Sequence, residues 1–401
     1  MLAANRIKNW QLKSEIGNDM DALISQLPFF TPEHHNLAHS VEQFVQREIE
    51  PRASSEEDVE GLARTFVSLL AEAGLLNYAV AESKLDVRSL CLIREALAYS
   101  SSLADLAFVM QGLGTYAISQ AAPEHVRDFW LSRAAKGKAI AAFALTEPEA
   151  GSDVSAIQTS ARRDGETYVI DGRKRFISNA GIADFYTVFA RTGTREDGRA
   201  ELSAFVVGSK MHGFSVVERT KLIAPHPIGQ IAFDGCRVPA EDMIGNEGDG
   251  FRLAMATLDT FRASVGAAAC GMARRALDEA VRYASQRKQF GRFLAEHQLV
   301  QARLADMITE LDAARLLVYR AAYARDTTTD RVTREASEAK LFATEAAGKI
   351  IDSAVQIHGG TGLISGTVVE RLYRDVRALR IYEGTSEIQK LVIAGQLLRE
   401  Q

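Results

Sequence analysis

The chain has 401 residues, which is more than one hydrophobic core usually supports, so we expect two or three domains. Its 47 basic and 52 acidic residues leave a net charge of −5, which gives no electrostatic reason to expect nucleic acid or a membrane as a partner. Hydrophobic residues make up 47% of the chain, as in ordinary globular proteins, and no apolar run is long enough to cross a bilayer.

The three cysteines, Cys91, Cys236 and Cys270, are far apart and odd in number. This argues against a disulfide framework or a zinc site and favours a reducing compartment, which is the cytoplasm, or the mitochondrial matrix in a eukaryote. Residues 1–26 carry three basic side chains before the first acidic one. Because acidic residues soon follow, we interpret this segment as an N-terminal extension, with a short transit peptide as the alternative.

A helical domain is predicted over residues 27–139. Thr31-Pro32-Glu33 offers a capping residue followed by proline at the first helical position, and Pro51 closes the segment. Between them, apolar residues recur at helical steps and form one face: Leu37, Val41, Phe44, Val45 and Ile49. Further helices are predicted over residues 62–73, 89–99 and 124–135.

The pattern changes near Ile140 and predicts a β domain over residues 140–245. Segments 168–170, 185–189 and 205–207 are rich in β-branched and aromatic residues. Three Asp-Gly pairs, which supply the positive φ of tight hairpin turns, punctuate this region: Asp164-Gly165, Asp171-Gly172 and Asp197-Gly198. Closely spaced strands of this kind predict an antiparallel barrel or sandwich without a β-α-β crossover.

Helices return over residues 246–401. Apolar residues keep the helical step over five turns at Val300, Leu304, Met307, Leu311, Ala314 and Val318. Long segments rich in alanine and leucine cover residues 251–286 and 334–357. Long helices joined by short loops predict an antiparallel bundle.

Two motifs of the β domain are candidate ligand sites. Thr146-Glu147-Pro148 and Gly151-Ser152-Asp153 follow a predicted strand with small and polar residues, whose N–H and hydroxyl groups suit a flat heteroaromatic ring or a phosphate. A second strand ends at Phe176-Ile177-Ser178, where an aromatic ring can stack on a ligand while a hydroxyl bonds to its edge. Taken alone, each motif is explained more simply as a structural turn.

Two further motifs lie in the helical region that follows. Arg287-Lys288-Gln289-Phe290-Gly291 and the nearby Gln298 combine a cation with an aromatic ring, which suits an adenosine diphosphate, although a basic helix end that binds its own carbonyls is the simpler alternative. Gln356-Ile357-His358-Gly359-Gly360 has glycines that let a backbone approach a pyrophosphate or that cap a helix. No strand precedes this run, so a nicotinamide-binding Rossmann unit is disfavoured.

The last motif is Tyr382-Glu383-Gly384-Thr385, followed by Ser386-Glu387-Ile388-Gln389. Ser386 and Gln389 fit a capping box, so a helix is predicted to begin there with Glu383 on the loop ahead of it. A carboxylate in this place is a candidate base, or it complements the helix dipole. His35 and His39 stand one helical turn apart, but no third ligand is evident, so a solvated helix face explains them better than a metal site.

Together and in this order, the motifs resemble those of the acyl-CoA dehydrogenases over essentially the whole chain from about Leu27, and the stretches at Thr146 to Asp153 and Tyr382 to Thr385 are the most specific. The resemblance implies an α+β multidomain fold with an N-terminal helical domain, a central antiparallel β domain and a C-terminal four-helix bundle. It implies FAD as the cofactor, no metal, an acyl-CoA substrate and a place in fatty acid β-oxidation. An electron-transfer flavoprotein is the expected partner, and a homotetramer arranged as a dimer of dimers is the expected assembly.

The resemblance also implies the site residues. One group of cofactor residues lies in the β domain: Phe143, Leu145, Thr146, Gly151, Ser152, Phe176, Ile177 and Ser178. A second group reaches the adenosine and pyrophosphate portion from the neighbouring subunit: Arg287, Gln289, Phe290, Gln298, Gln356, Gly359 and Gly360. Thr385 and Glu387 touch the cofactor from the catalytic loop. Substrate contacts are expected at Ser152, Asp259, Arg262 and Gly384.

Glu383 matches the catalytic base of the family. Some branched-chain members place the base on the helix that corresponds to residues 257–262, where this chain has Phe261 just before Arg262. The implied reaction removes the proton next to the thioester, transfers a hydride from the β-carbon to flavin N5 and gives a trans-2-enoyl thioester. An apolar acyl chain that closes over Glu383 is expected to raise the pKa of its carboxyl group.

Two rival interpretations share the scaffold: an acyl-CoA oxidase or flavin monooxygenase, and a non-enzymatic relative that acts as an assembly factor. The second is expected to lose Glu383 or the Gly359-Gly360 pair, and this chain has both. Three departures from the family pattern bear on ligand binding. Phe176 stands where many relatives have tryptophan, the loop at 78–86 is short, and Pro225-His226-Pro227 replaces a turn that usually bears Ser or Thr. The sequence does not fix the length, branching or ring content of the acyl group, the choice between coenzyme A and an acyl carrier protein, or the electron acceptor.

Overall fold

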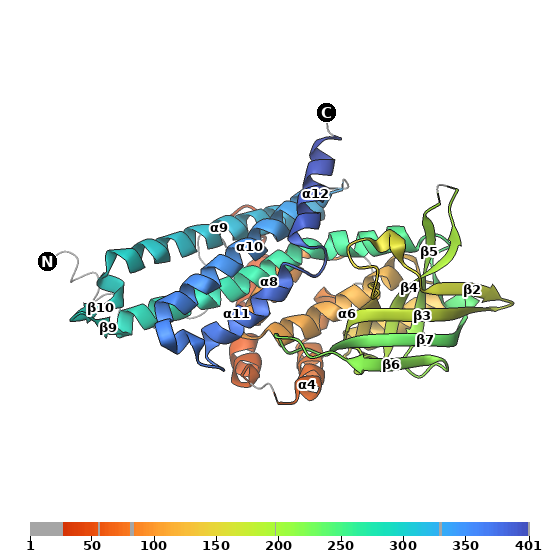
Figure 1. Ribbon diagram of the computed structural model, residues 1–401, viewed down its shortest axis with the longest axis horizontal. Coiled ribbons are helices and arrows are strands. Elements are labelled where there is room, and N and C mark those ends of the chain that lie inside the picture. The colour runs from red at the N-terminus through yellow and green to blue at the C-terminus, as the bar shows by residue number, and fades with distance from the viewer. Residues whose placement is uncertain (1–26, 55–56, 81–83, 197, 329–330, 400–401) are drawn as a thin grey trace.

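The computed structural model describes residues 27–54, 57–80, 84–196, 198–328 and 331–399. In this part of the chain a helical region comes first, a β-sheet follows, and long helices return. The molecule is elongated, with the sheet at one end and the far tip of the helical bundle at the other (Figure 1). The predicted N-terminal extension, residues 1–26, lies outside the described residues.

The first helical region confirms the predicted segments and adds a helix that the periodicity missed. Its helices are α3 (Pro32–Phe44), α4 (Val59–Glu72), α5 (Val87–Ser100), α6 (Ser102–Ala121) and α7 (Glu124–Ala135). A π-helical turn at Val45–Ile49 continues α3, and 3₁₀ turns follow at Glu50–Arg52 and Leu75–Tyr78. Thr31 caps α3 and Pro32 begins it, as expected. Helix α6 is buried on nearly every side, so its sequence lacks the one-sided apolar pattern that reveals a surface helix.

Eight strands of the described chain form one sheet. They are β1 (Ala141–Ala144), β2 (Ser160–Asp164), β3 (Thr167–Ser178), β4 (Phe185–Thr194), β5 (Ala200–Gly208), β6 (Phe214–Arg219), β7 (Ile228–Pro239) and β8 (Met243–Ile244). The order is β6-β7-β3-β2-β4-β5-β8, and β1 pairs with β4. The sheet is mostly antiparallel, as expected, but β1 and β2 both pair with β4 in parallel.

The Asp-Gly pairs that the structure describes differ in position, since one lies in a turn and the other inside a strand. Gly165 has a φ of +63° between β2 and β3, which confirms the predicted turn. Gly172 instead lies inside β3, where the pairing with β7 changes register, so the prediction of a hairpin turn there is wrong. A Cβ on Gly172 would come within 2.7 Å of Thr159, so the glycine permits the segment just before β2 to approach β3 closely. Asp197 lies outside the described residues.

The bundle comprises α8 (Gly250–Gln286), α9 (Gln298–Thr327), α10 (Thr333–His358), α11 (Val368–Leu379) and α12 (Ser386–Leu397). A small hairpin of β9 (Lys288–Gln289) and β10 (Arg292–Phe293) joins α8 to α9 at the tip of the bundle (Figure 1). Small residues let these helices pack closely: a Cβ on Gly271 of α8 would meet the carbonyl oxygen of Glu95 on α5 at 2.1 Å. The core of the first helical region is thereby fixed to the bundle.

None of the described helices is both long and apolar enough to span a membrane. The three cysteines are buried and free.

Candidate active site

The loop between α11 and α12 carries Glu383, as the sequence predicted. The helix that follows begins at Ser386, but its capping residue is Thr385, whose hydroxyl accepts a hydrogen bond from the N–H of Ile388 at 3.3 Å. The predicted capping box of Ser386 and Gln389 is therefore wrong: the cap is Thr385, one residue earlier, and the Gln389 side chain bonds to the carbonyls of the preceding loop. Ser386 cannot cap the helix because its hydroxyl donates to Oε1 of Glu345 on α10 at 2.6 Å.

The backbone of this loop is held in an unusual conformation. Glu383 has a φ of +53° and Gly384 a φ of +92°, a region that costs energy for a residue with a side chain. The buried amide of Gln389 donates to the carbonyls of Glu383 at 3.2 Å and Gly384 at 3.0 Å. Lys340 of α10 donates its Nζ to the carbonyl of Gly384 at 2.7 Å. These contacts fix the direction of the Glu383 side chain.

The Glu383 carboxylate points into the protein. Its Oε2 is buried and has no hydrogen-bond partner among the described residues. Burial raises the pKa of Glu383, and the positive charges of Arg94, Lys340 and Arg262 oppose that rise. A carboxylate with a raised pKa and a free oxygen is suited to accept a proton.

Arg94 of α5 is a fixed cation beside this carboxylate. It is fully buried, and its Nε and Nη2 donate to the two carboxylate oxygens of Asp105 on α6, each at 2.7 Å. Its Nη1 donates to Oγ of Ser264 on α8 at 2.9 Å. A bidentate pair of this kind leaves the guanidinium little freedom to move, so its field acts from a constant position.

The predicted substrate residues Asp259 and Arg262 lie on α8 and contact each other. Arg262 Nη1 is 2.5 Å from Oδ1 of Asp259, while its Nε is buried without a hydrogen-bond partner in the described chain. The neighbouring Phe261 is fully buried, with its ring 5.9 Å from that of Tyr116. An apolar ring therefore occupies the position at which an alternative base was considered from the sequence.

The β-domain group of predicted cofactor residues is brought together at the ends of β1 and β3. The N–H of Arg175 donates to the carbonyl of Thr146 at 2.9 Å, which places the Thr146 turn beside Phe176. Phe176 has a φ of +55°, its side chain is 49% exposed, and the guanidinium of Arg175 lies 4.8 Å from its ring. Gly151 and Ser152 are exposed on the turn that follows. An accessible aromatic face next to exposed N–H and hydroxyl groups fits a flat heteroaromatic ring such as a flavin.

The Pro-His-Pro departure lies at the same place. His226 is packed against the end of β3, with Nε2 3.5 Å from Oγ of Ser178, and burial lowers the pKa of His226 to about 4. The carbonyl of Pro227 accepts a hydrogen bond from the N–H of Asn179 at 2.8 Å. The segment thus supports the turn after Ser178 with a neutral imidazole.

The second group of predicted cofactor residues lies at the opposite end of the molecule, where β9 and β10 are labelled in Figure 1. Tyr283 of α8 stacks on His358 of α10 with ring centroids 4.4 Å apart, which brings the ends of these helices together. The side chain of Phe290 is 94% exposed. Within one chain the structure therefore does not bring this group to the β domain. Its members are Arg287, Gln289, Phe290, Gln298, Gln356, Gly359 and Gly360.

Backbone strain marks the predicted site independently of side-chain chemistry. In the described chain, four residues other than glycine have a left-handed φ: Phe176, Asn179, Phe290 and Glu383. Asparagine adopts this conformation readily, but phenylalanine and glutamate do not. The other three are all predicted site residues, and strained residues persist where the surrounding structure serves a function.

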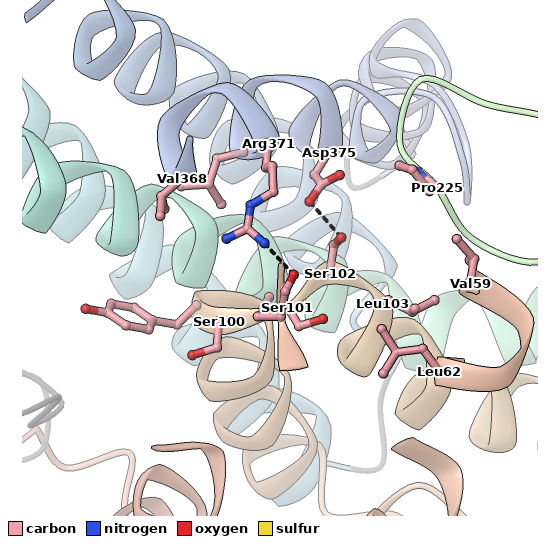
Figure 2. A pocket seen from close by; sticks show the side chains of 14 residues that line it. Val59, Leu62, Ser100, Ser101, Ser102, Leu103, Pro225, Val368, Arg371 and Asp375 are labelled. Atoms are coloured by element: carbon pink, nitrogen blue, oxygen red, sulfur yellow. Dashed lines mark hydrogen bonds between the residues drawn. The ribbon is translucent and has the colours of Figure 1, made fainter. Parts of the chain in front are cut away.

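Two cavities adjoin the helices around Glu383. One of about 180 Å³ is lined by Tyr116, Gln120, Thr260 and the cationic Lys84 and Arg325. The other is about 40 Å³, enough for roughly three waters, and lies where α5 meets α6 against α11 (Figure 2). In it Ser102 donates to Oδ2 of Asp375 at 2.7 Å. None of the predicted site residues lines the smaller cavity.

The fold and the site define a flavin-dependent oxidoreductase, and comparisons with known proteins give the family. Family models of acyl-CoA dehydrogenases match the chain in three parts: the N-terminal domain over residues 31–138, the middle domain over 142–236 and the C-terminal domain over 248–398. The chain is 39% identical over 379 residues to the 3-(aryl)acrylate reductase of Clostridium sporogenes, covering 92% of this chain and all of that protein.

Solved structures agree. Butyryl-CoA dehydrogenase from Megasphaera elsdenii matches with a TM-score of 0.86 and 34% identity, covering 92% of this chain and 99% of that one. An acyl-CoA dehydrogenase from Bacillus anthracis in complex with FAD matches with a TM-score of 0.83 and 32% identity, covering 92% and 68%. The chain therefore belongs to the acyl-CoA dehydrogenase family of FAD-dependent oxidoreductases, which confirms the predicted family, fold class, enzyme class and cofactor.

Several residues of the site were not found from the sequence. Lys340, Arg94 and Asp105 are charged residues inside apolar helical faces, and Gln389 is a fully buried amide. The sequence did contain a signal for these buried charges: each interrupts an apolar helical face, and charged residues in such places are seldom buried without a partner. The partner itself comes from another helix, so the pairing becomes visible only in the folded chain.

Proposed function

We propose that this protein catalyses the α,β-dehydrogenation of an acyl-CoA thioester to the trans-2-enoyl thioester, with Glu383 as the base that removes the α-proton. The observation that carries the proposal is the buried, unpartnered Oε2 of Glu383 on a loop fixed by Gln389 and Lys340. A catalytic base needs an oxygen that no other group occupies and a pKa closer to neutrality than that of a solvated carboxylate. Glu383 meets both conditions.

The other predicted site residues would bind the cofactor and the substrate. The exposed ring of Phe176 and the turn at Gly151-Ser152 would hold the flavin, which would supply the hydride acceptor when bound. Arg262 and Asp259 face the substrate from α8, and the cationic Lys84 and Arg325 at the larger cavity suit the phosphates of coenzyme A.

The second group of cofactor residues supports a homotetramer built as a dimer of dimers. Because these residues lie at the tip of the bundle, at the opposite end of the molecule from the sheet to which Phe176 belongs, they would serve the flavin of a neighbouring copy. Native mass spectrometry of the FAD-loaded protein is expected to show four copies of the 43.8 kDa chain. A monomer with full FAD would contradict this assignment.

Glu383→Gln tests the base. The variant is expected to keep bound FAD and to lose turnover by about 10²- to 10⁴-fold, because the amide cannot accept the proton. Glu338→Gln, on the outer part of α10 beside Arg320, is the matched control and keeps wild-type turnover. Turnover of Glu383→Gln within tenfold of wild type would refute the role of Glu383.

A panel of acyl-CoA thioesters that bleach the flavin without oxygen identifies the substrate. Since the Clostridium relative is named as an acrylate reductase, the same panel includes enoyl thioesters with pre-reduced enzyme. An electron-transfer flavoprotein is the proposed acceptor. Rapid reoxidation of the product-bound enzyme by oxygen would favour an oxidase instead.

A further inference from the structure

Lys340 is a buried cation to which the proposed dehydrogenase reaction assigns no role. It is fully buried on α10, where its helical neighbours Ala336, Ser337, Ala343 and Thr344 are buried too. Its Nζ donates to the carbonyl of Gly384 at 2.7 Å. In the described ranges no carboxylate forms an ion pair with it. A buried ammonium group without a counter-ion is costly, so its retention needs a reason.

The other charges around Glu383 are already balanced. Arg94 of α5 is neutralised by Asp105 of α6, and Arg262 of α8 is neutralised by Asp259. On α10 itself, Glu345 forms an ion pair with Arg380 and accepts a hydrogen bond from the hydroxyl of Ser386. Glu387 of α12 also acts on Lys340 but is exposed to solvent, and Tyr382 is uncharged because burial raises the pKa of its hydroxyl. Among the buried charged groups that the structure describes around this loop, the positive Lys340 and the negative Glu383 are left without a salt-bridge partner.

We propose that Lys340 is a positioning residue for the catalytic carboxylate: it anchors the Glu383–Gly384 turn through the Gly384 carbonyl and supplies the buried positive charge that keeps Glu383 ionised and ready to accept a proton. The inference rests on the proposed role of Glu383 as the base. It assigns Lys340 two separable tasks, a hydrogen bond and a charge, and variants can remove them one at a time.

The charge sets the pH range of the reaction. Burial lowers the pKa of Lys340 to about 8, while Glu383 opposes this change, so Lys340 carries its positive charge on the acid side of neutrality. A neighbouring positive charge lowers the pKa of a carboxyl group. Removing it raises the pKa of Glu383, and the base then stays protonated up to a higher pH. The acid limb of the pH profile of kcat/KM therefore moves upward.

Three variants separate the tasks in the FAD-loaded enzyme. Lys340→Gln keeps an N–H donor for the Gly384 carbonyl but has no charge, and Lys340→Met has neither. Both are expected to move the acid limb upward by about one pH unit, the lower end of the effect of one nearby charge. Lys340→Met is also expected to lower kcat, since the turn is no longer anchored. Lys340→Arg keeps the charge and restores the wild-type limb.

Lys349→Met is the matched control. Lys349 lies on the same helix, its side chain is 70% exposed, and it pairs weakly with Glu310 at 3.6 Å. This change leaves both the acid limb and kcat as in wild type.

A measurement that does not depend on turnover, the titration of Glu383, distinguishes the proposed role of Lys340 from the proposed role of Glu383 as the base. Infrared difference spectra of oxidised enzyme labelled with 13C-glutamate give the titration of Glu383, identified as the band that Glu383→Gln removes. This band is expected to titrate at higher pH in Lys340→Gln. If Lys340→Gln and Lys340→Met only lower the melting temperature and leave the band and the acid limb in place, Lys340 is structural and the inference is overturned. If Glu383→Gln retains turnover but the band still shifts, the proposed base is wrong while the electrostatic coupling stands.

Discussion

Glu147 in the β domain and Glu383 at the catalytic loop each lie near a fully buried lysine, but they differ in the hydrogen bonds that their carboxylate oxygens accept. Both oxygens of Glu147 are occupied: Oε1 accepts from Lys174 at 2.8 Å and from the N–H of Thr159 at 2.9 Å, and Oε2 accepts from the N–H of Gln158 at 2.7 Å. The lysine near Glu383 instead bonds to a backbone carbonyl, and Oε2 of Glu383 is left without a partner among the described residues.

The two pKa directions follow from this difference. Burial acts to raise the pKa of Glu147, but the charge and hydrogen bond of Lys174 and the two N–H groups outweigh it, and the pKa falls below its ordinary value. For Glu383 burial prevails over the nearby cations, and the pKa rises. A buried glutamate whose oxygens are all bonded stabilises the fold, whereas one with a free oxygen is available for proton transfer.

Removing Glu147 is expected to have the larger effect on stability. Glu147→Ala leaves the Lys174 ammonium and two N–H groups buried without their partner, so the free energy of unfolding should fall by about 3–5 kcal/mol in urea titrations. Glu149→Ala, an exposed glutamate two residues away, is the matched control and should change it by less than about 0.5 kcal/mol. A similar small change in Glu147→Ala would mean that the pair does not hold the Thr146 turn in place.

Glu383→Gln should have a smaller effect on stability, in the opposite direction. At pH 8 the free energy of unfolding should rise by about 1 kcal/mol, because a buried ionised group with an unsatisfied oxygen is replaced by a neutral one. A carboxyl group with a raised pKa contributes stability that is present below its unfolded pKa, about 4.3, and lost as the pH rises through the folded value.

The gain from Glu383→Gln should therefore vanish near pH 4, as thermal unfolding at both pH values would reveal. For Glu147 the sign is reversed: with a lowered pKa its stabilisation is present at neutral pH and is lost as the pH falls through the folded value. A Glu383→Gln variant that is less stable than wild type at pH 8 would place the carboxylate in a satisfied structural pair, like that of Glu147.

The sequence predicted those helices and strands whose position depends on residues close together along the chain. The cap at Thr31 and the proline at position 32 fix the start of α3, and the β-branched runs locate β3, β4 and β5. Helix α6 escaped prediction because burial on nearly every side removes the alternation of apolar and polar residues. Gly172 was assigned to a turn because Asp-Gly is a turn signal, but it lies inside β3, where only a residue without a Cβ leaves room for Thr159, just before β2.

The sequence by itself determined the family, the order of helical and β regions, the cofactor and the candidate base at Glu383, because these depend on residue types at fixed spacings along the chain. Only the tertiary structure decided which charges surround that base. Arg94, Asp105, Arg262 and Lys340 reach Glu383 from different helices, far apart in sequence. A carboxylate becomes a base through the burial and the partners that folding gives it, and those are properties of the packed helices.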